Sequence, residues 1–121
     1  MPDEGRQRVT GIGGVFFRAE HPEALAAWYR EHLGVPVSPD GYVVFPQSRE
    51  THWVPFPRES DYWPRERALM VNFTVDDLDG MLEQLRRDGV EVEDRVEEQE
   101  YGRFGWCLDP EGNRIELWQP A

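Results

Sequence analysis

Residues 101–120 read YGRFGWCLDPEGNRIELWQP and carry the clearest structural signal in the sequence. Two β-rich runs are separated by the turn formers of residues 109–113, in which proline favours the start of a turn and glycine supplies a positive φ. The stretch therefore predicts a β-hairpin. In its second run, Ile115 and Leu117 form the apolar alternate set and should pack under the helices. This alternation turns Glu116 and Trp118 toward the opposite, concave face of the sheet.

The residues upstream of this hairpin predict a strand followed by a helix. ALMVNFTV (68–75) is a β-rich run. DDLDGMLEQLRRDGV (76–90) places leucines and a methionine on one helical stripe, with Asp76 or Asp77 as the N-cap and Gly89 as the terminator. A charged connector leads from this helix into the hairpin.

The first half of the chain repeats this order. TGIGGVFF (10–17) predicts a strand, and HPEALAAWYREHLG (21–34) predicts an amphipathic helix that ends at Gly34. Three short β-rich runs follow it: VPV, GYVVF and THWVPF. We therefore predict a single α+β domain over residues 1–121, with two βαβββ modules in tandem that form a curved mixed sheet around a central cleft, helices outside. Module 1 spans about 9–57, a proline-rich linker about 57–67, and module 2 about 68–120.

Composition limits the classes of partner. Lys and Arg number 13 against 24 Asp and Glu, so the formal net charge is −11. Such a field repels nucleic acid and anionic membranes and attracts cations. Cys107 is the only cysteine, which rules out an intrachain disulfide and favours a cytoplasmic location. The sequence shows neither an export signal nor a membrane-spanning run, so we expect no insertion into a membrane.

Three segments carry a resemblance to a known family: GGVFFRAEHPEALAAWYREHLGV, VNFTVDDLDGMLEQLRRDGVEVE and YGRFGWCLDPEGNRIELWQP. Together they resemble the vicinal oxygen chelate (VOC) superfamily of glyoxalases, bleomycin-resistance proteins and dioxygenases, over roughly residues 9–120. The resemblance implies a VOC domain that binds a small molecule in its cleft, and a homodimer.

The resemblance also supplies four positions at which family members hold a divalent metal. They fall here on Gly14, on His52 (or Trp53, if the register slips by one residue), on Met70 and on Glu116. Glycine has no side chain, and a thioether suits soft Cu(I) better than zinc, nickel, iron or manganese. We therefore expect no complete metal site and no cofactor; His52 and Glu116 are the only ordinary ligands left if a divalent metal does bind.

Glu116 is the candidate catalytic residue. It either recognises a ligand or acts as a general base, or it pairs with Arg103 or Arg114 as a structural remnant of the family pattern. The side chains that we expect to line the ligand site are His52, Trp53, Trp63, Met70, Asn72, Tyr101, Arg103, Trp106 and Trp118.

Three functions stay open at this point. The first is a metal-free enzyme or binder of small molecules. The second is a metal-dependent lyase, isomerase or dioxygenase. The third is a non-catalytic resistance protein that sequesters a cationic aromatic drug, which the acidic charge and the tryptophans favour.

Overall fold

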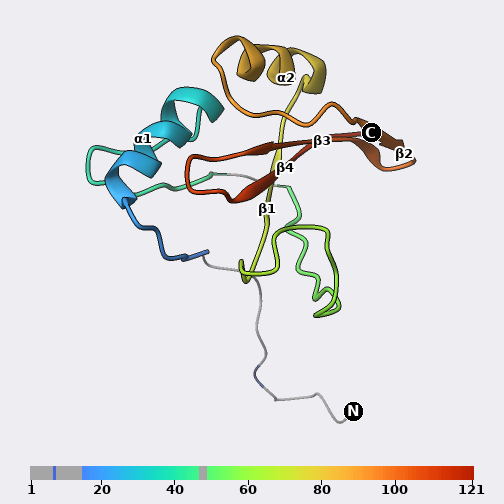
Figure 1. Ribbon diagram of the computed structural model, residues 1–121, viewed down its shortest axis with the longest axis horizontal. Helices are drawn as coiled ribbons and strands as arrows, with labels where there is room; N and C mark the ends of the chain where they lie inside the picture. Colours follow the sequence, from blue (N-terminus) through green and yellow to red (C-terminus); the bar gives the residue numbers. More distant parts are fainter. Residues whose placement is uncertain (1–6, 8–14, 47–48) are drawn as a thin grey trace.

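The computed structural model describes residue 7, residues 15–46 and residues 49–121. In chain order its elements are α1 (Pro22–Leu33), β1 (Val71–Thr74), α2 (Leu78–Arg87), β2 (Glu97–Gln99), β3 (Gly102–Leu108) and β4 (Arg114–Pro120) (Figure 1). Gly14 and most of the predicted first strand lie outside the described residues. None of the described helices is long and apolar enough to cross a membrane.

The strands form one mixed sheet in the order β1-β4-β3-β2. β1 runs parallel to β4, whereas β2 and β3, and β3 and β4, pair antiparallel. The predicted hairpin is confirmed: the Asp109 N–H donates to the Asn113 carbonyl (3.0 Å), and Gly112 adopts a φ of 83°. The second half therefore has the predicted βαβββ order.

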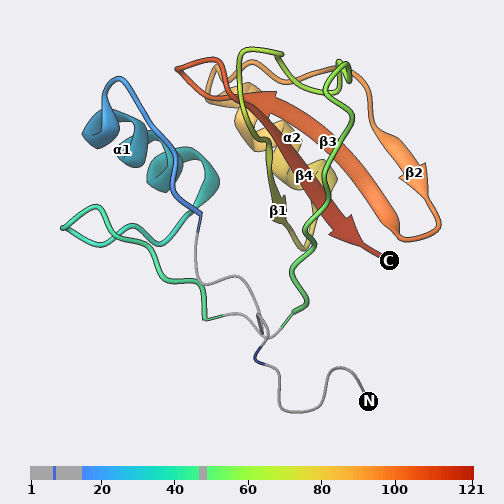
Figure 2. The same cartoon turned by 90° about the horizontal axis from the view of Figure 1, so that it is seen from below.

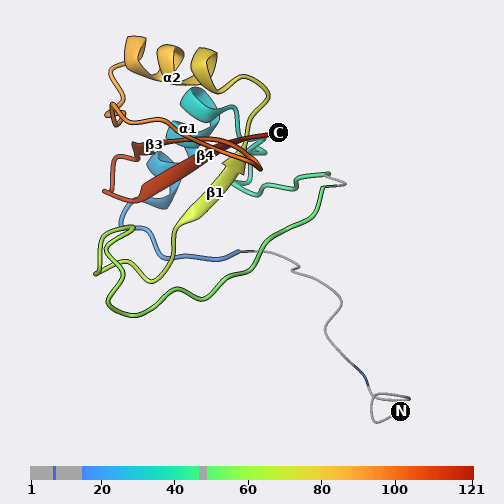
Figure 3. The same ribbon diagram turned by 90° about the vertical axis from the view of Figure 1, so that its right-hand side faces the viewer.

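α2 covers one face of the sheet, α1 lies beside the sheet, and the segment 49–67 crosses the other face (Figures 1 and 3). Figure 2 looks onto this second face. Leu78, Leu82 and Leu85 of α2 are buried in the core with Ile115 and Leu117 of β4, so one face of the hairpin packs under the helices as the sequence predicts.

A carboxylate accepts backbone N–H groups at the start of each helix. The Asp77 carboxylate accepts the Gly80 N–H at the start of α2 (3.1 Å). At the start of α1 the carboxylate comes from the distant hairpin turn, where Glu111 accepts the N–H groups of Glu20 (2.8 Å) and His21 (2.9 Å). The turn between β3 and β4 thus fixes the position of α1 against the second half.

The strands predicted for the first half are not formed within the described residues. Val37 and Val43 make an isolated bridge, and residues 15–17 and 51–56 are irregular. A strand needs a partner for its backbone N–H and C=O groups, and prolines at 36, 46 and 55 remove donors from these runs. Apolar side chains of this half are exposed, including Phe16 (89%) and Trp53 (76%). The tandem arrangement of two modules therefore stays a prediction.

Candidate ligand-binding site

The site is built around Glu116, whose side chain points away from the helices as predicted. Asn72 on β1 and Trp106 on β3 are its cross-strand partners, so the three side chains lie in one row on the same face. The Asn72 Nδ2 donates to Oε1 of Glu116 (2.7 Å), and the Trp106 Nε1 donates to Oε2 (3.0 Å). Glu116 is only 8% exposed. A carboxylate buried to this degree needs such donors.

A third donor to Glu116 comes from the proline-rich segment that crosses this face. The Tyr62 hydroxyl donates to Oε2, the same oxygen that accepts from Trp106. Burial and the hydrogen bond to Glu116 raise the pKa of Tyr62, so the hydroxyl stays protonated and remains a donor. All three donors to the carboxylate are neutral groups.

Arg114 lies beside this row but is committed to another carboxylate. Its Nε and Nη2 each lie 2.7 Å from an oxygen of Glu93, and its Nη1 donates to the Tyr62 carbonyl (2.5 Å). The guanidinium carbon is 4.7 Å from the centroid of the Trp106 ring and 5.1 Å from that of Tyr62, within range of cation–π attraction. Arg114 therefore packs on the aromatic rings while Glu93 neutralises its charge.

An aromatic surface continues from this row along the sheet. Phe104 and Trp118, which are cross-strand partners, stack with ring centroids 6.0 Å apart and planes 2° from parallel. The His52 ring lies 5.6 Å from Trp118, and the Tyr101 ring lies 5.9 Å from Phe104. Both His52 and Trp53 are exposed; His52 makes the ring contact with Trp118 on β4, and Trp53 is 76% exposed.

Glu116 pairs with neither Arg103 nor Arg114, the structural alternative that the sequence left open. Arg103 alternates with Phe104 along β3, so its side chain lies on the helix side, where its Nη2 is 3.0 Å from Asp79 Oδ1. Within the described ranges neither arginine forms an ion pair with Glu116. Arg103 is therefore not brought to the predicted ligand site.

Two other predicted site residues lie at its margin. Trp63 packs on Phe56 with ring centroids 4.9 Å apart, and its Nε1 donates to the Arg67 carbonyl (3.0 Å), so its contacts stay inside the crossing segment. Met70 is half-buried one residue before β1.

The donor set around Glu116 does not fit a metal centre. In the part of the chain that is described, no group of three or more His, Cys, Asp or Glu side chains is placed to hold an ion. Both oxygens of Glu116 already accept hydrogen bonds from Tyr62, Asn72 and Trp106. This arrangement suits recognition of a hydrogen-bond donor better than coordination of a cation.

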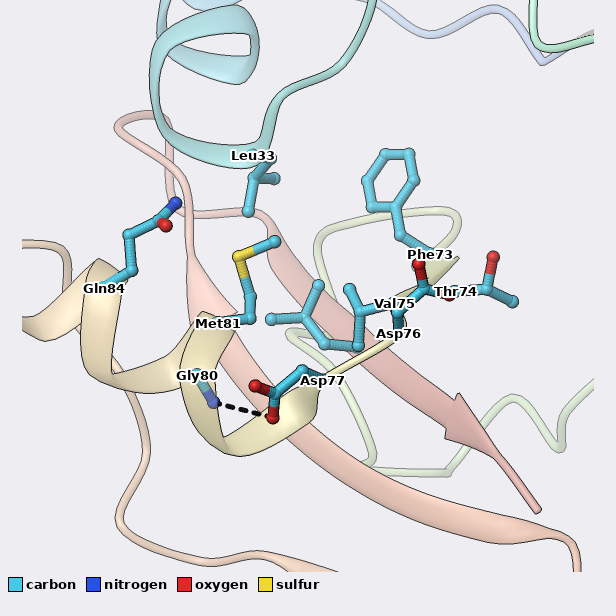
Figure 4. Close-up of a pocket in the computed structure, with 10 residues that line it drawn as sticks. Leu33, Phe73, Thr74, Val75, Asp76, Asp77, Gly80, Met81 and Gln84 are labelled. Carbon is cyan, nitrogen blue, oxygen red and sulfur yellow. Dashed lines mark hydrogen bonds between the residues drawn. The ribbon is translucent and has the colours of Figure 1, made fainter.

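A hollow of about 510 Å³ lies on the opposite side of the sheet, between the end of α1, β1 and α2 (Figure 4). Its walls include Leu33, Phe73 and Met81. The Asp77 carboxylate at its mouth is already used to cap α2, as the dashed line in Figure 4 shows. Because the other face carries a buried carboxylate with convergent donors, we place the site there; the Tyr62 side chain covers that carboxylate.

Tyr62 and Arg114 are not among the ligand-site residues predicted from the sequence. Arg114 shares the alternation of Glu116 and Trp118 along β4, so strand periodicity could have assigned it to this face. Tyr62 belongs to a segment without periodicity. Its only signal was an aromatic pair between prolines in a connector.

Comparison with known proteins identifies the family of this chain. The sequence model of the Glyoxalase-like domain family matches residues 14–118. The fold is similar to a glyoxylase/bleomycin resistance protein/dioxygenase domain from Frankia sp. EAN1pec (16% identity, TM-score 0.61, covering 94% of this chain and 100% of that one).

Two further solved structures are similar to this chain. One is a member of the glyoxalase/bleomycin resistance protein/dioxygenase superfamily from Sphaerobacter thermophilus DSM 20745 (20% identity, TM-score 0.53, covering 84% of this chain and 90% of that one). The other is TnmS3, an antibiotic-binding protein from Streptomyces sp. CB03234 (25% identity, TM-score 0.53, 82% and 86%). No curated protein sequence matches this chain significantly. The chain therefore belongs to the Glyoxalase-like domain family and, with it, to the VOC superfamily.

Proposed function

We propose that this chain binds a small aromatic molecule on the sheet face that carries Glu116, and that it does so without the full metal site of its family. One observation carries the proposal: a buried carboxylate, held by three neutral donors, lies next to a row of aromatic rings. Such a combination supplies a flat apolar surface and one polar group that fixes orientation.

Charge supports a neutral or cationic ligand. The chain carries a formal net charge of −11, and Glu116 places one of the negative charges within the site. An anionic ligand would meet repulsion from both. TnmS3 is an antibiotic-binding protein, and its similarity to this chain makes sequestration of a cationic aromatic drug the first use to test.

A titration of tryptophan fluorescence tests this proposal. Bleomycin, ethidium and a panel of further cationic aromatic antibiotics should change the emission saturably, at micromolar concentrations. Trp118→Ala should weaken the response at least tenfold. Trp28→Phe is the matched control, because Trp28 packs on Tyr29 of α1 on the helix side (5.2 Å between ring centroids). A flat response across the whole panel contradicts sequestration of a cationic aromatic drug.

A second candidate is an enzyme in which Glu116 acts as a general base. The contact between the Tyr62 hydroxyl and the Glu116 carboxylate favours it, since a ligand hydroxyl or acidic C–H in the same place would be within reach of a proton acceptor. This candidate predicts that the wild-type chain exchanges an acidic C–H proton of its ligand for deuterium in heavy water. Glu116→Gln should abolish that exchange while binding persists. Binding with no Glu116-dependent exchange leaves the first proposal standing and removes this one.

We further propose that the protein is a homodimer. The apolar side chains exposed in the first half support it, as does the outer edge of β1, which pairs with no other described strand. Light scattering should return about twice the chain mass of 14.2 kDa. A single-chain mass at micromolar concentration contradicts the dimer.

The lone buried cysteine supports a reducing, cytoplasmic location.

A further inference from the structure

The segment 55–67, here called the strap, is closed mainly on itself. Its internal hydrogen bonds join Ser60 N to the Pro57 carbonyl, Arg67 N to the Pro64 carbonyl, Trp63 Nε1 to the Arg67 carbonyl and Arg65 Nη2 to the Glu59 carbonyl. Phe56 packs on Tyr62 and Trp63 within the same segment. The strap can therefore keep its own turns when it moves as a unit.

Few contacts hold the strap to the rest of the protein. The Tyr62 hydroxyl reaches Glu116, Arg114 donates to the Tyr62 carbonyl, and Arg67 donates to the Glu111 carbonyl. None of the apolar residues of the strap belongs to the core cluster formed by the described residues. Lifting the strap would thus break these polar contacts and the ring contact between Tyr62 and Trp106, and it would leave the core cluster of helix and strand residues intact.

The surface beneath Tyr62 is held in place independently of the strap. Asn72 and Trp106 donate to Glu116 from neighbouring strands, and Glu93 fixes Arg114 by two contacts of 2.7 Å. The Tyr62 ring itself meets Trp106 edge-on, with centroids 6.3 Å apart and planes at 84°. Removing the Tyr62 side chain would leave a preformed surface that presents the Glu116 acceptor, the Trp106 ring and the guanidinium of Arg114; the guanidinium carbon of Arg95 also lies 4.7 Å from the Trp106 centroid.

We propose that Tyr62 is a displaceable internal ligand, and that the site beneath the strap selects a hydroxylated aromatic ring whose hydroxyl replaces Tyr62 as a donor to Glu116. This inference rests on the proposed binding function and names its ligand class. A ring without a donor would leave the Glu116 oxygen short of one hydrogen bond, and a carboxylate on the ring would be repelled. A phenol reproduces the group that the protein itself places there.

Tyr62→Ala tests the inference with phenol as the probe and toluene as the same shape without a hydroxyl. Binding is measured from the shift of the Trp106 indole N–H resonance. We expect Tyr62→Ala to bind phenol at least tenfold more tightly than toluene, and more tightly than the wild-type chain, which must first expel Tyr62. The wild-type chain should still bind phenol at higher concentration. Adding Glu116→Gln should abolish the preference over toluene.

Two further variants keep the test decisive. Tyr62→Phe preserves the ring packing and removes the hydroxyl, so it should bind phenol severalfold more tightly than wild type even if Tyr62→Ala folds poorly. Tyr42→Ala removes a tyrosine that is 67% exposed and should gain no phenol binding. Equal binding of phenol and toluene by folded Tyr62→Ala, no gain in Tyr62→Phe, or no displacement by phenol in the wild type would each overturn the inference.

The two proposals fail separately. Cationic aromatic compounds that quench wild-type fluorescence, together with no phenol preference in the Tyr62 variants, would leave a binding protein whose Tyr62 is merely structural. Phenol binding with no response to any cationic compound would support the internal ligand and contradict drug sequestration.

Discussion

Tyr29 on α1 donates its hydroxyl to Asp109 in the hairpin turn, with Oη and Oδ2 2.8 Å apart. Asp109 is 5% exposed and also accepts the backbone N–H groups of Glu111 (2.8 Å) and Asn113 (3.0 Å). Burial and the contact with Asp109 raise the pKa of Tyr29, so its hydroxyl stays a donor. Together with the Glu111 contacts, this side-chain contact joins α1 to the turn between β3 and β4.

Tyr29→Phe should therefore destabilise the fold. It removes a hydrogen bond to a buried carboxylate and keeps the ring, so we expect a loss of about 2 kcal/mol in the free energy of unfolding. Urea denaturation followed by circular dichroism measures it. Tyr42→Phe, at an exposed tyrosine, should change the same quantity by less than about 0.5 kcal/mol. Equal effects of the two changes would show that the contact with Asp109 contributes nothing.

Stability should fall in acid through Glu93. Its hydrogen bonds with Arg114 hold the pKa of the carboxyl below the ordinary value of 4.5. Because the pKa is lower in the folded than in the unfolded chain, the pair stabilises the fold above about pH 4.5 and the contribution is lost as pH falls through the folded value. Wild type should exceed Glu93→Gln in unfolding free energy at pH 7, and the difference should shrink as the pH falls below 4.5.

Glu98→Gln serves as the control for that series. Glu98 also lies near an arginine, with its Oε2 3.8 Å from Nε of Arg103, but 76% of its side chain is exposed. Its unfolding free energy should track wild type at every pH. A constant gap between wild type and Glu93→Gln across the pH range would contradict the assigned role of Glu93.

Gly102→Ala should be costly for a steric reason. Gly102 has a φ of 137°, and a Cβ built there would lie 2.6 Å from Nε1 of Trp118 and collide with the Gln119 carbonyl. We expect a loss of about 2 to 3 kcal/mol. Gly41→Ala is matched in its positive φ (79°) but has open space around the added Cβ, so its loss should stay near 1 kcal/mol. Similar losses in both would mean that backbone conformation alone sets the cost.

Divalent metals should not stabilise the protein through Glu116. Its oxygens are engaged by neutral donors, so we expect zinc, nickel, manganese and iron(II) to leave the unfolding midpoint of wild type and Glu116→Gln equally unchanged. The unfolding midpoint is measured by differential scanning fluorimetry on chelator-treated protein to which each metal is added back. A saturable rise that disappears in Glu116→Gln would establish the metal-dependent alternative instead.

Cys107 should be unreactive in the folded chain. The residue is fully buried, and burial raises the pKa of its thiol to about 12, which leaves almost no thiolate at neutral pH. Ellman's reagent should modify it slowly in buffer and within seconds in concentrated urea. Fast modification of the native protein would require the core to open under native conditions.

Much of the second half could be predicted, because its signals are local. The spacing of Leu78, Leu82 and Leu85 predicted a helix that buries one stripe, and the alternation of Ile115 and Leu117 predicted which way Glu116 points. The same alternation places Arg103 on the opposite face from Trp106, in contrast to its predicted place in the ligand site.

The strands of the first half were expected from β-rich composition. Composition does not show whether another strand lies close enough to pair with such a run. A strand forms where another backbone meets its N–H and C=O groups, and within the described residues only the bridge between Val37 and Val43 does so.

The sequence by itself determined the two helices, the hairpin and the inward direction of Glu116, since each follows from a repeat of 3.6 or 2 residues along a short stretch. Only the tertiary structure decided that Tyr62 covers Glu116 and that Glu93 takes Arg114, across separations of 54 and 21 residues. Such contacts depend on the path of segments that have no periodicity. That path is set by the contacts that these segments make with the folded sheet.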